Sequence, residues 1–246
     1  MYEAEESQWW YTGMRALSRA LLEEPLRNLV SGGGPTSGGR RLALLDAGCG
    51  TGGNLAHLGR WGRAVGIDLS TDALDHCRER GVAAARAALL ALPFEDGSFD
   101  AVTSFDVVYH AWVTDDRAAT REMVRVLRRG GLILVRVPAL RILWGGHDVE
   151  VQSRHRYTRK ELKALLEETG LEVLRITYGN FFLFPLLLLR RTLDRVTGRV
   201  GSDVGFLPAP LEWAFRRLLE LEGALVRRGW SLPIGASVMA LGRKTA

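Results

Sequence analysis

The chain has few cysteines and no apolar run long enough to span a bilayer. Its 246 residues contain only Cys49 and Cys77, which cannot form a disulfide framework and suit a reducing compartment, so we expect a cytoplasmic protein. The longest apolar run covers residues 181–189, whereas a membrane helix needs about 20 residues. The acidic first residues lack the features of a secretory signal. No pair of histidines or cysteines has metal-ligand spacing, so we predict no metal site.

Basic residues exceed acidic residues by 33 to 28, which gives a formal net charge of +5. Nearly all of them are arginines scattered along the chain, and no basic stripe alternates with aromatic residues. We therefore expect no nucleic-acid partner. The hydrophobic content of 47% and the length predict one large domain with a full core.

Strands and helices are expected to alternate after residues 31–39, whose glycine and serine content predicts a flexible linker. The expected strands are 41–46, 64–68, 82–88, 99–105, 132–137, 171–178 and 237–241. The expected helices are 5–30, 54–60, 71–81 with Thr71 as N-cap, 117–128, 158–169 with a capping box of Thr158 and Glu161, a helix from 181 broken near Pro185, and 211–228. This order predicts a mostly parallel sheet with helices on both faces. Residues 139–157 have no clear period and are predicted to form an ordered loop over the site.

The turn at residues 46–54, Asp-Ala-Gly-Cys-Gly-Thr-Gly-Gly-Asn, joins the first strand to the next helix, where open α/β sheets bind ligands. Glycine allows positive φ angles and close approach of a ligand to the backbone. Asp68 follows at the tip of the second strand, where its carboxylate can accept both hydroxyls of a ribose. These features predict an adenosyl cofactor. Because Gly48, Gly50 and Gly53 also satisfy the dinucleotide spacing, a nicotinamide-dependent oxidoreductase stays open on spacing alone.

Three stretches resemble class I S-adenosylmethionine-dependent methyltransferases of the type 11 kind. Residues 44–52 resemble motif I of that family. Residues 92–102, Leu-Pro-Phe-Glu-Asp-Gly-Ser-Phe-Asp-Ala-Val, resemble its signature before the fourth strand, and residues 122–137 resemble the helix and turn before the fifth. The resemblance favours S-adenosylmethionine as cofactor and S-adenosylhomocysteine as product. It also implies a Rossmann-like sheet of seven strands with an antiparallel last strand.

The resemblance implies a cofactor site around the glycine turn. The glycines would wrap the methionine portion, Asp68 would bind the ribose and Leu69 would pack on the adenine. One departure is Ala88, which stands where relatives often carry an acidic residue, so backbone groups near Leu89 and Leu90 are expected to meet the adenine edge. The expected cofactor residues are Tyr11, Arg15, Asp46, Gly48, Cys49, Gly50, Gly52, Asn54, Asp68, Leu69, Ala88, Leu89, Leu90, Phe105 and Asp106.

The amino-terminal residues 1–30 resemble a lid helix of this family. Tyr11 and Arg15 are expected to close over the methionine carboxylate, although Trp9 and Trp10 could instead only anchor the helix to the sheet. We expect a single domain with three parts: the lid, a cofactor-binding core at 40–140, and substrate-side segments at 139–157 and 180–230.

Methyl transfer is an in-line displacement, so the protein mainly positions the acceptor and excludes water. We expect the acceptor to be a small molecule that receives the methyl group on an oxygen, nitrogen or carbon atom. A hydroxyl acceptor also needs a general base. His110 is the candidate base because its unperturbed pKa is about 6.5, and packing beside the cofactor is an equal alternative. Contacts with the acceptor are expected from Tyr109 and Trp112. They are also expected from His147 and Tyr157, for which a structural role is favoured.

Residues 181–189 are apolar all round and arginines follow them. They could wall a pocket for an apolar acceptor or lie at a membrane surface. A buried helix is the simpler interpretation and is favoured over membrane contact. A non-catalytic module that keeps the cofactor fold also stays open as an alternative for the whole chain.

Overall fold

The computed structural model describes residues 5, 8–31, 41–197 and 207–245, so residues 32–39 of the expected linker fall outside them, and its first residue, Ser31, ends a helix. Seven strands form one sheet: β1 (Leu42–Ala47), β2 (Gly62–Asp68), β3 (Ala84–Arg86), β4 (Phe99–Phe105), β5 (Leu127–Pro138), β6 (Leu171–Gly179) and β7 (Ser237–Lys244). Their order is β3-β2-β1-β4-β5-β7-β6. β7 pairs antiparallel with β5 and β6, and the other pairs are parallel. The predicted sheet with an antiparallel last strand is confirmed.

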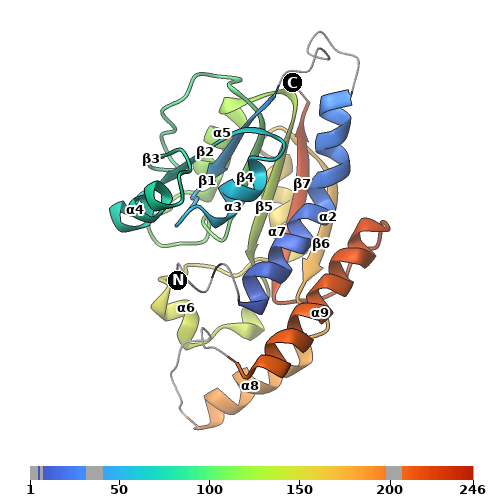
Figure 1. Cartoon of the computed structure of the whole chain (residues 1–246). Coiled ribbons are helices and arrows are strands. Elements are labelled where there is room, and N and C mark those ends of the chain that lie inside the picture. The colour runs from blue at the N-terminus through green and yellow to red at the C-terminus, as the bar shows by residue number, and fades with distance from the viewer. Residues whose placement is uncertain (1–4, 6–7, 32–40, 198–206, 246) are drawn as a thin grey trace.

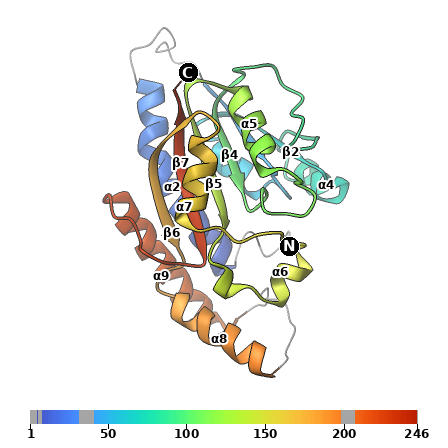
Figure 2. The ribbon, with the colours of Figure 1, turned by 180° about the vertical axis from the view of Figure 1, so that it is seen from behind.

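Helices cover both faces of this sheet. α2 (Trp9–Ser31), α3 (Gly53–Leu58) and α4 (Thr71–Glu79) lie on the face turned to the viewer in Figure 1. α5 (Asp116–Val126) and α7 (Arg159–Glu167) lie on the opposite face, seen in Figure 2. α8 (Phe184–Thr197) and α9 (Ala209–Arg227) follow β6, and α9 packs along α2. That contact is close, because a Cβ on Gly13 would lie 2.2 Å from Leu219 Cδ1.

Several element ends differ from the predicted ones. Ser70, rather than Thr71, caps α4, since its hydroxyl accepts from the Ala73 amide at 3.2 Å. α5 ends at Val126 and β5 begins five residues before the predicted start, because the fully buried Leu127 pairs with Phe99 of β4. The capping box of α7 forms as predicted.

The segment at 139–157 contains two short helices, η1 (Arg141–Leu143) and α6 (Gly146–Glu150). The buried guanidinium of Arg156 holds it in place through two hydrogen bonds to Asp148, at 2.7 and 3.1 Å. The sequence of this segment has no hydrophobic period because its helices are too short to show one. An internal ion pair, rather than a long apolar face, holds them in place.

The apolar helix after β6 differs most from expectation. Pro185 lies in the first turn of α8 and does not break the helix. Backbone amides in the first turn have no hydrogen-bond acceptor within the helix, so a proline there costs no hydrogen bond. The prediction of a buried helix is wrong: Leu186, Leu189 and Leu193 are 50%, 56% and 54% exposed. No helix among the described residues is long and apolar enough to cross a membrane.

Candidate functional site

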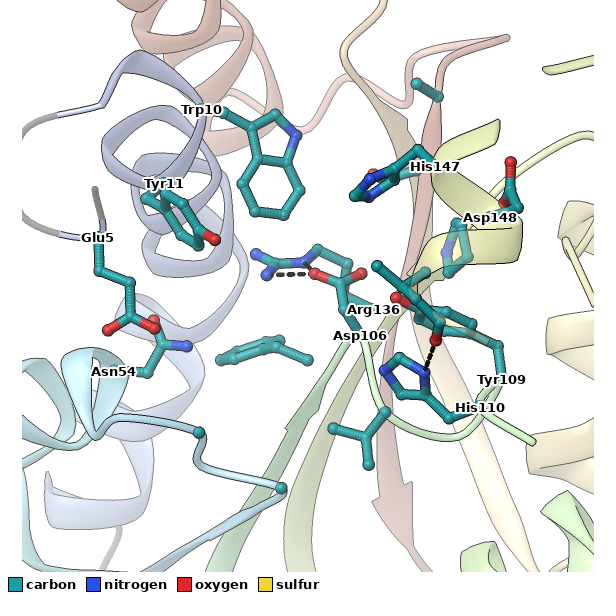
Figure 3. Close-up of a pocket in the computed structure, with 18 of the residues that line it drawn as sticks. Glu5, Trp10, Tyr11, Asn54, Asp106, Tyr109, His110, Arg136, His147 and Asp148 are labelled. Atoms are coloured by element: carbon teal, nitrogen blue, oxygen red, sulfur yellow. Dashed lines mark hydrogen bonds and ion pairs between the residues drawn. The ribbon is translucent and has the colours of Figure 1, made fainter. Parts of the chain in front are cut away.

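A cavity of about 1100 Å³ opens at the carboxyl ends of β1, β2 and β4, beneath α2 and α8. Figure 3 shows Glu5 and Asn54 on one side, Tyr109, His110 and His147 on the other, and Arg136 with Asp106 between them. Most residues predicted for cofactor or acceptor line this cavity: Tyr11, Arg15, Gly48, Cys49, Gly50, Asn54, Asp68, Leu69, Ala88, Leu89, Leu90, Phe105, Asp106, Tyr109, His110, Trp112 and His147. The fold thus brings residues from all parts of the sequence to one place.

The glycine turn presents backbone rather than side chains to the cavity. Gly48 has a φ of 88°, and a Cβ there would lie 2.2 Å from Val107 Cγ2. Gly50 has a φ of 53°, and only Glu5 Oε1, at 4.0 Å, would be near its Cβ. The amides of Gly48 and Cys49 both donate to the Ile67 carbonyl at 2.9 Å, which fixes the turn against β2. Open space therefore lies over the backbone of Gly50, as a ligand in close contact requires, whereas Val107 fills the space beside Gly48.

Asp68 lies at the end of β2 and joins this turn to the next one. Its carboxylate accepts from the Gly50 amide at 2.8 Å and the Ser70 amide at 2.9 Å. Leu69 beside it is 40% exposed, and Ala88 and Leu89 line the same part of the cavity. An acidic acceptor, an apolar face and backbone groups at an edge suit a ribose and an adenine ring, so these residues fit an adenosyl cofactor.

Arg136 of β5, which the sequence analysis did not select, forms the middle of the cavity. It donates to Asp106 through Nε at 2.8 Å and pairs with it through Nη2 at 2.6 Å. Its guanidinium lies 5.2 Å from the Trp10 ring and 4.9 Å from the Phe105 ring. An arginine within the otherwise apolar run of β5 was the available signal, because arginine is rarely buried without a partner.

The amino-terminal segment covers the glycine turn. Tyr11 and Arg15 line the cavity, and burial together with Glu5 and Asp106 raises the pKa of Tyr11 to about 12. Trp9 packs edge-on against Phe215 of α9 at 5.2 Å, and both Trp9 and Trp10 also line the cavity, so neither side chain only anchors the helix to the sheet.

Glu5 was also missed. Its carboxylate accepts a hydrogen bond from Thr51 Oγ1 and lies 3.5 Å from Arg80 Nη2. Those partners are 46 and 75 residues away in the sequence, so no local spacing could have identified the contact.

His110 has a defined tautomer in this structure. Its Nδ1 lies 2.7 Å from the Val151 carbonyl, which can only accept, so Nδ1 carries the proton and Nε2 of the neutral ring is unprotonated. The ring stacks on Trp112 at 4.2 Å, and burial lowers its pKa below the usual value. The arrangement therefore holds a neutral imidazole with one basic nitrogen in the cavity.

Three predicted residues do not line the cavity. Asp46 is buried beneath the turn, where Thr103 Oγ1 donates to its Oδ1 at 2.7 Å, and burial raises its pKa to about 7. Gly52 faces Val82, whose Cγ2 lies 2.8 Å from the position of its Cβ. Tyr157 is buried and its hydroxyl donates to Asp116 at 2.6 Å. Asp46 and Gly52 can shape the turn from below, and Tyr157 holds the 139–157 segment to α5.

The far end of the cavity is apolar. The apolar residues of α8, α9 and their neighbours that line it are Leu183, Leu186, Leu187, Leu207, Leu211 and Phe215, and Arg190 and Arg191 of α8 also line the cavity. His147 lies near this end, and its buried Nδ1 has no partner within the described part of the chain. Among the described residues no cluster of His, Cys, Asp or Glu could hold a metal ion.

Known proteins resemble this chain mainly in part of its length. Residues 45–135 match the family model of a methyltransferase domain. A probable S-adenosylmethionine-dependent methyltransferase of Mycolicibacterium smegmatis is 36% identical over 139 residues, which are 53% of this chain and 52% of that protein. A tRNA (carboxymethyluridine(34)-5-O)-methyltransferase of Xenopus tropicalis is 40% identical over 99 residues, 39% of this chain and 15% of that protein. The chain thus spans about half the length, or less, of these two relatives.

A solved structure shares the fold over most of the chain. A candidate sarcosine dimethylglycine methyltransferase from Galdieria sulphuraria superposes with a TM-score of 0.60 and 19% identity, covering 94% of this chain and 86% of that one. The family match, the relatives and the glycine turn with Asp68 at the strand ends agree with one another. Residues 45–135 therefore match a methyltransferase domain, and the chain is similar to S-adenosylmethionine-dependent methyltransferases in the sequence of this region and to a methyltransferase in fold.

Proposed function

We propose that this chain transfers a methyl group from S-adenosylmethionine to an apolar small-molecule acceptor. The observation that supports this most directly is one cavity with two unlike ends, the glycine turn with Asp68 and the apolar wall from α8 and α9. Its volume of about 1100 Å³ exceeds the usual range of about 300–1,000 Å³ for a single ligand site. There is room for a cofactor and a second molecule.

When bound, the cofactor would supply an electrophilic methyl group on a sulfonium, and the electron pair of the broken carbon–sulfur bond would stay on sulfur. The backbone of Gly48 and Gly50 and the carboxylate of Asp68 would hold the cofactor, and Tyr11 with Arg15 would cover it. The apolar wall orients the acceptor and excludes water, so that the acceptor lone pair forms the new bond to carbon. Where the acceptor atom carries a proton, Nε2 of His110 takes it.

Isothermal titration calorimetry tests the cofactor half of this proposal. We expect S-adenosylhomocysteine to bind more tightly than NADH or NADPH. Asp68→Asn should weaken the binding of S-adenosylhomocysteine by about 10- to 100-fold, because the substitution removes a charged hydrogen-bond acceptor. Asp72→Asn, an exposed change on the neighbouring α4, should leave the affinity unchanged. Tighter binding of a nicotinamide cofactor would overturn the assignment.

The acceptor half is tested by product formation. The relative named for tRNA supplies the alternative, a nucleoside acceptor. A nucleoside drawn into a pocket needs polar contacts to its base edge, whereas leucines and Phe215 wall this end of the cavity. With radiolabelled cofactor, we expect label in organic-soluble acceptors rather than in tRNA. Label in tRNA alone would contradict the apolar acceptor, and no label with any acceptor would favour a non-catalytic module.

A further inference from the structure

α8 carries an apolar stripe that faces solvent. Leu186, Leu189, Leu193 and Val196 are 50%, 56%, 54% and 80% exposed. Their spacing of three, four and three residues places them on one side of the helix. Of the fourteen residues of α8, only Phe184 and Arg191 are buried. The stripe therefore has no partner among the described residues.

The stripe is continuous with the apolar end of the cavity. Leu186 is both the first residue of the stripe and part of the cavity wall, beside Leu183 and Leu187. Leu183 is buried and Leu187 is partly buried, so the leucines pass from solvent into the cavity within about one turn of helix. These leucines form an apolar path from the stripe to the cavity, which Arg190 and Arg191 of the same helix also line.

Arg190 and Arg195 are exposed on the same helix as the stripe, whereas Arg191 is buried. α8 contains Arg190, Arg191 and Arg195 and one acid, Asp194, whose Oδ2 lies 3.9 and 3.7 Å from the first two. Arg195 donates to the carbonyls of Ile142 at 2.6 Å and Trp144 at 3.2 Å, which ties α8 to η1.

Further arginines gather at this junction. A second cavity, of about 520 Å³, is lined by Arg141, Trp144, Arg154, His155, Arg156 and Arg195, of which Arg156 is buried and paired with Asp148. Beside it Ile142 is 53% exposed and adds to the apolar surface. Exposed leucines flanked by arginines are typical of a helix that lies at the surface of an anionic bilayer.

We propose that α8 and η1 form a docking surface for anionic phospholipid membranes, with the stripe in the headgroup region and the arginines at the phosphates. Docked in this way, the cavity opens toward the bilayer at Leu186, where an apolar acceptor enters. The arginines favour a membrane over a second copy of the chain, because self-association through α8 brings cation against cation. The docking follows from the exposed stripe and the charges, and only the acceptor entry rests on the proposed function.

Vesicle flotation of the full chain tests the docking. We expect binding to vesicles of phosphatidylcholine mixed with phosphatidylglycerol, weaker binding to phosphatidylcholine alone, and release as salt screens the arginines. Leu189→Glu with Leu193→Glu should weaken binding by about tenfold or more, since two leucines leave the interface and two negative charges enter it. These residues do not line the cavity, so the affinity for S-adenosylhomocysteine should stay unchanged and report a folded protein.

Leu221→Glu on α9 is the matched control, because Leu221 is 47% exposed and lies outside the stripe. It should bind vesicles as the unaltered chain does. The proposal would be overturned if the unaltered chain failed to bind anionic vesicles, or if Leu221→Glu lost as much vesicle binding as the double substitution. A dimer in light scattering that the double substitution converts to monomer would also overturn it, since the stripe is then a self-association surface. Failed methyl transfer with intact vesicle binding would count against the proposed function alone.

Discussion

At the scale of single residues, the proton on His110 decides what this ring can do. The Val151 carbonyl fixes the proton on Nδ1, and burial lowers the pKa, so the ring should be neutral at pH 7 with a basic Nε2. We expect ¹⁵N NMR of histidine-labelled protein to show this tautomer and a titration below about pH 6.5. An imidazolium at pH 7, or a proton on Nε2, would contradict the assignment as base.

The same pKa sets the pH dependence of methyl transfer to a hydroxyl acceptor. Because only the neutral ring accepts a proton, the rate should fall as the pH drops through the lowered pKa and stay level above it. His110→Gln should reduce the rate by about 10²- to 10⁴-fold. His57→Gln, a change of an exposed histidine on α3, should not.

At the scale of elements, Glu222 of α9 holds the junction between β6 and α8. Its fully buried carboxylate accepts from the amides of Asn180 at 2.8 Å and Phe182 at 3.0 Å. Burial raises its pKa to about 7, although these two amides lower it. The folded state therefore binds a proton that the unfolded chain releases near pH 4.5, so the contribution to stability should fall as the pH rises from about 4.5 to 7.

Replacing Glu222 should change this slope. In Glu222→Gln the unfolding free energy, measured in urea between pH 5 and 8, should depend less steeply on pH than in the unaltered chain. Some dependence of the unfolding free energy on pH should remain in this variant, because the pKa of Asp46 is also raised to about 7. Glu220→Gln at a neighbouring, more exposed position should reproduce the unaltered slope. A slope unchanged by Glu222→Gln would show that its carboxyl titrates as in the unfolded chain.

At the scale of the whole molecule, one cavity joins the glycine turn, α2 and α8. A ligand that binds only the folded chain stabilises it by about 2.7 kcal/mol at 100 times its dissociation constant. For a chain of this size we expect S-adenosylhomocysteine to raise the melting temperature by about 5–10 °C. Differential scanning calorimetry measures this, with adenosine as the weaker control. No shift at saturating ligand would contradict a cofactor site in this cavity.

The resemblance to a known family implied the antiparallel last strand. The sequence by itself determined the order of strands and helices, the mostly parallel sheet, and the turn that faces a cofactor. These are local properties: hydrophobic period, caps and glycine positions are set by neighbours along the chain. Asp68 could be selected for the same reason, since strand ends of a parallel sheet meet at one edge.

Only the tertiary structure decided which side chains meet in the cavity and which face of α8 stays exposed. Glu5 reaches Thr51, and Arg136 reaches Asp106, across loops whose closure no local pattern encodes. The side chains of Asp46 and Tyr157 instead form hydrogen bonds with Thr103 and Asp116 and do not line the cavity. The apolar run of α8 fits a buried helix or a surface helix equally well by composition. Its exposure depends on what the rest of the fold packs against it.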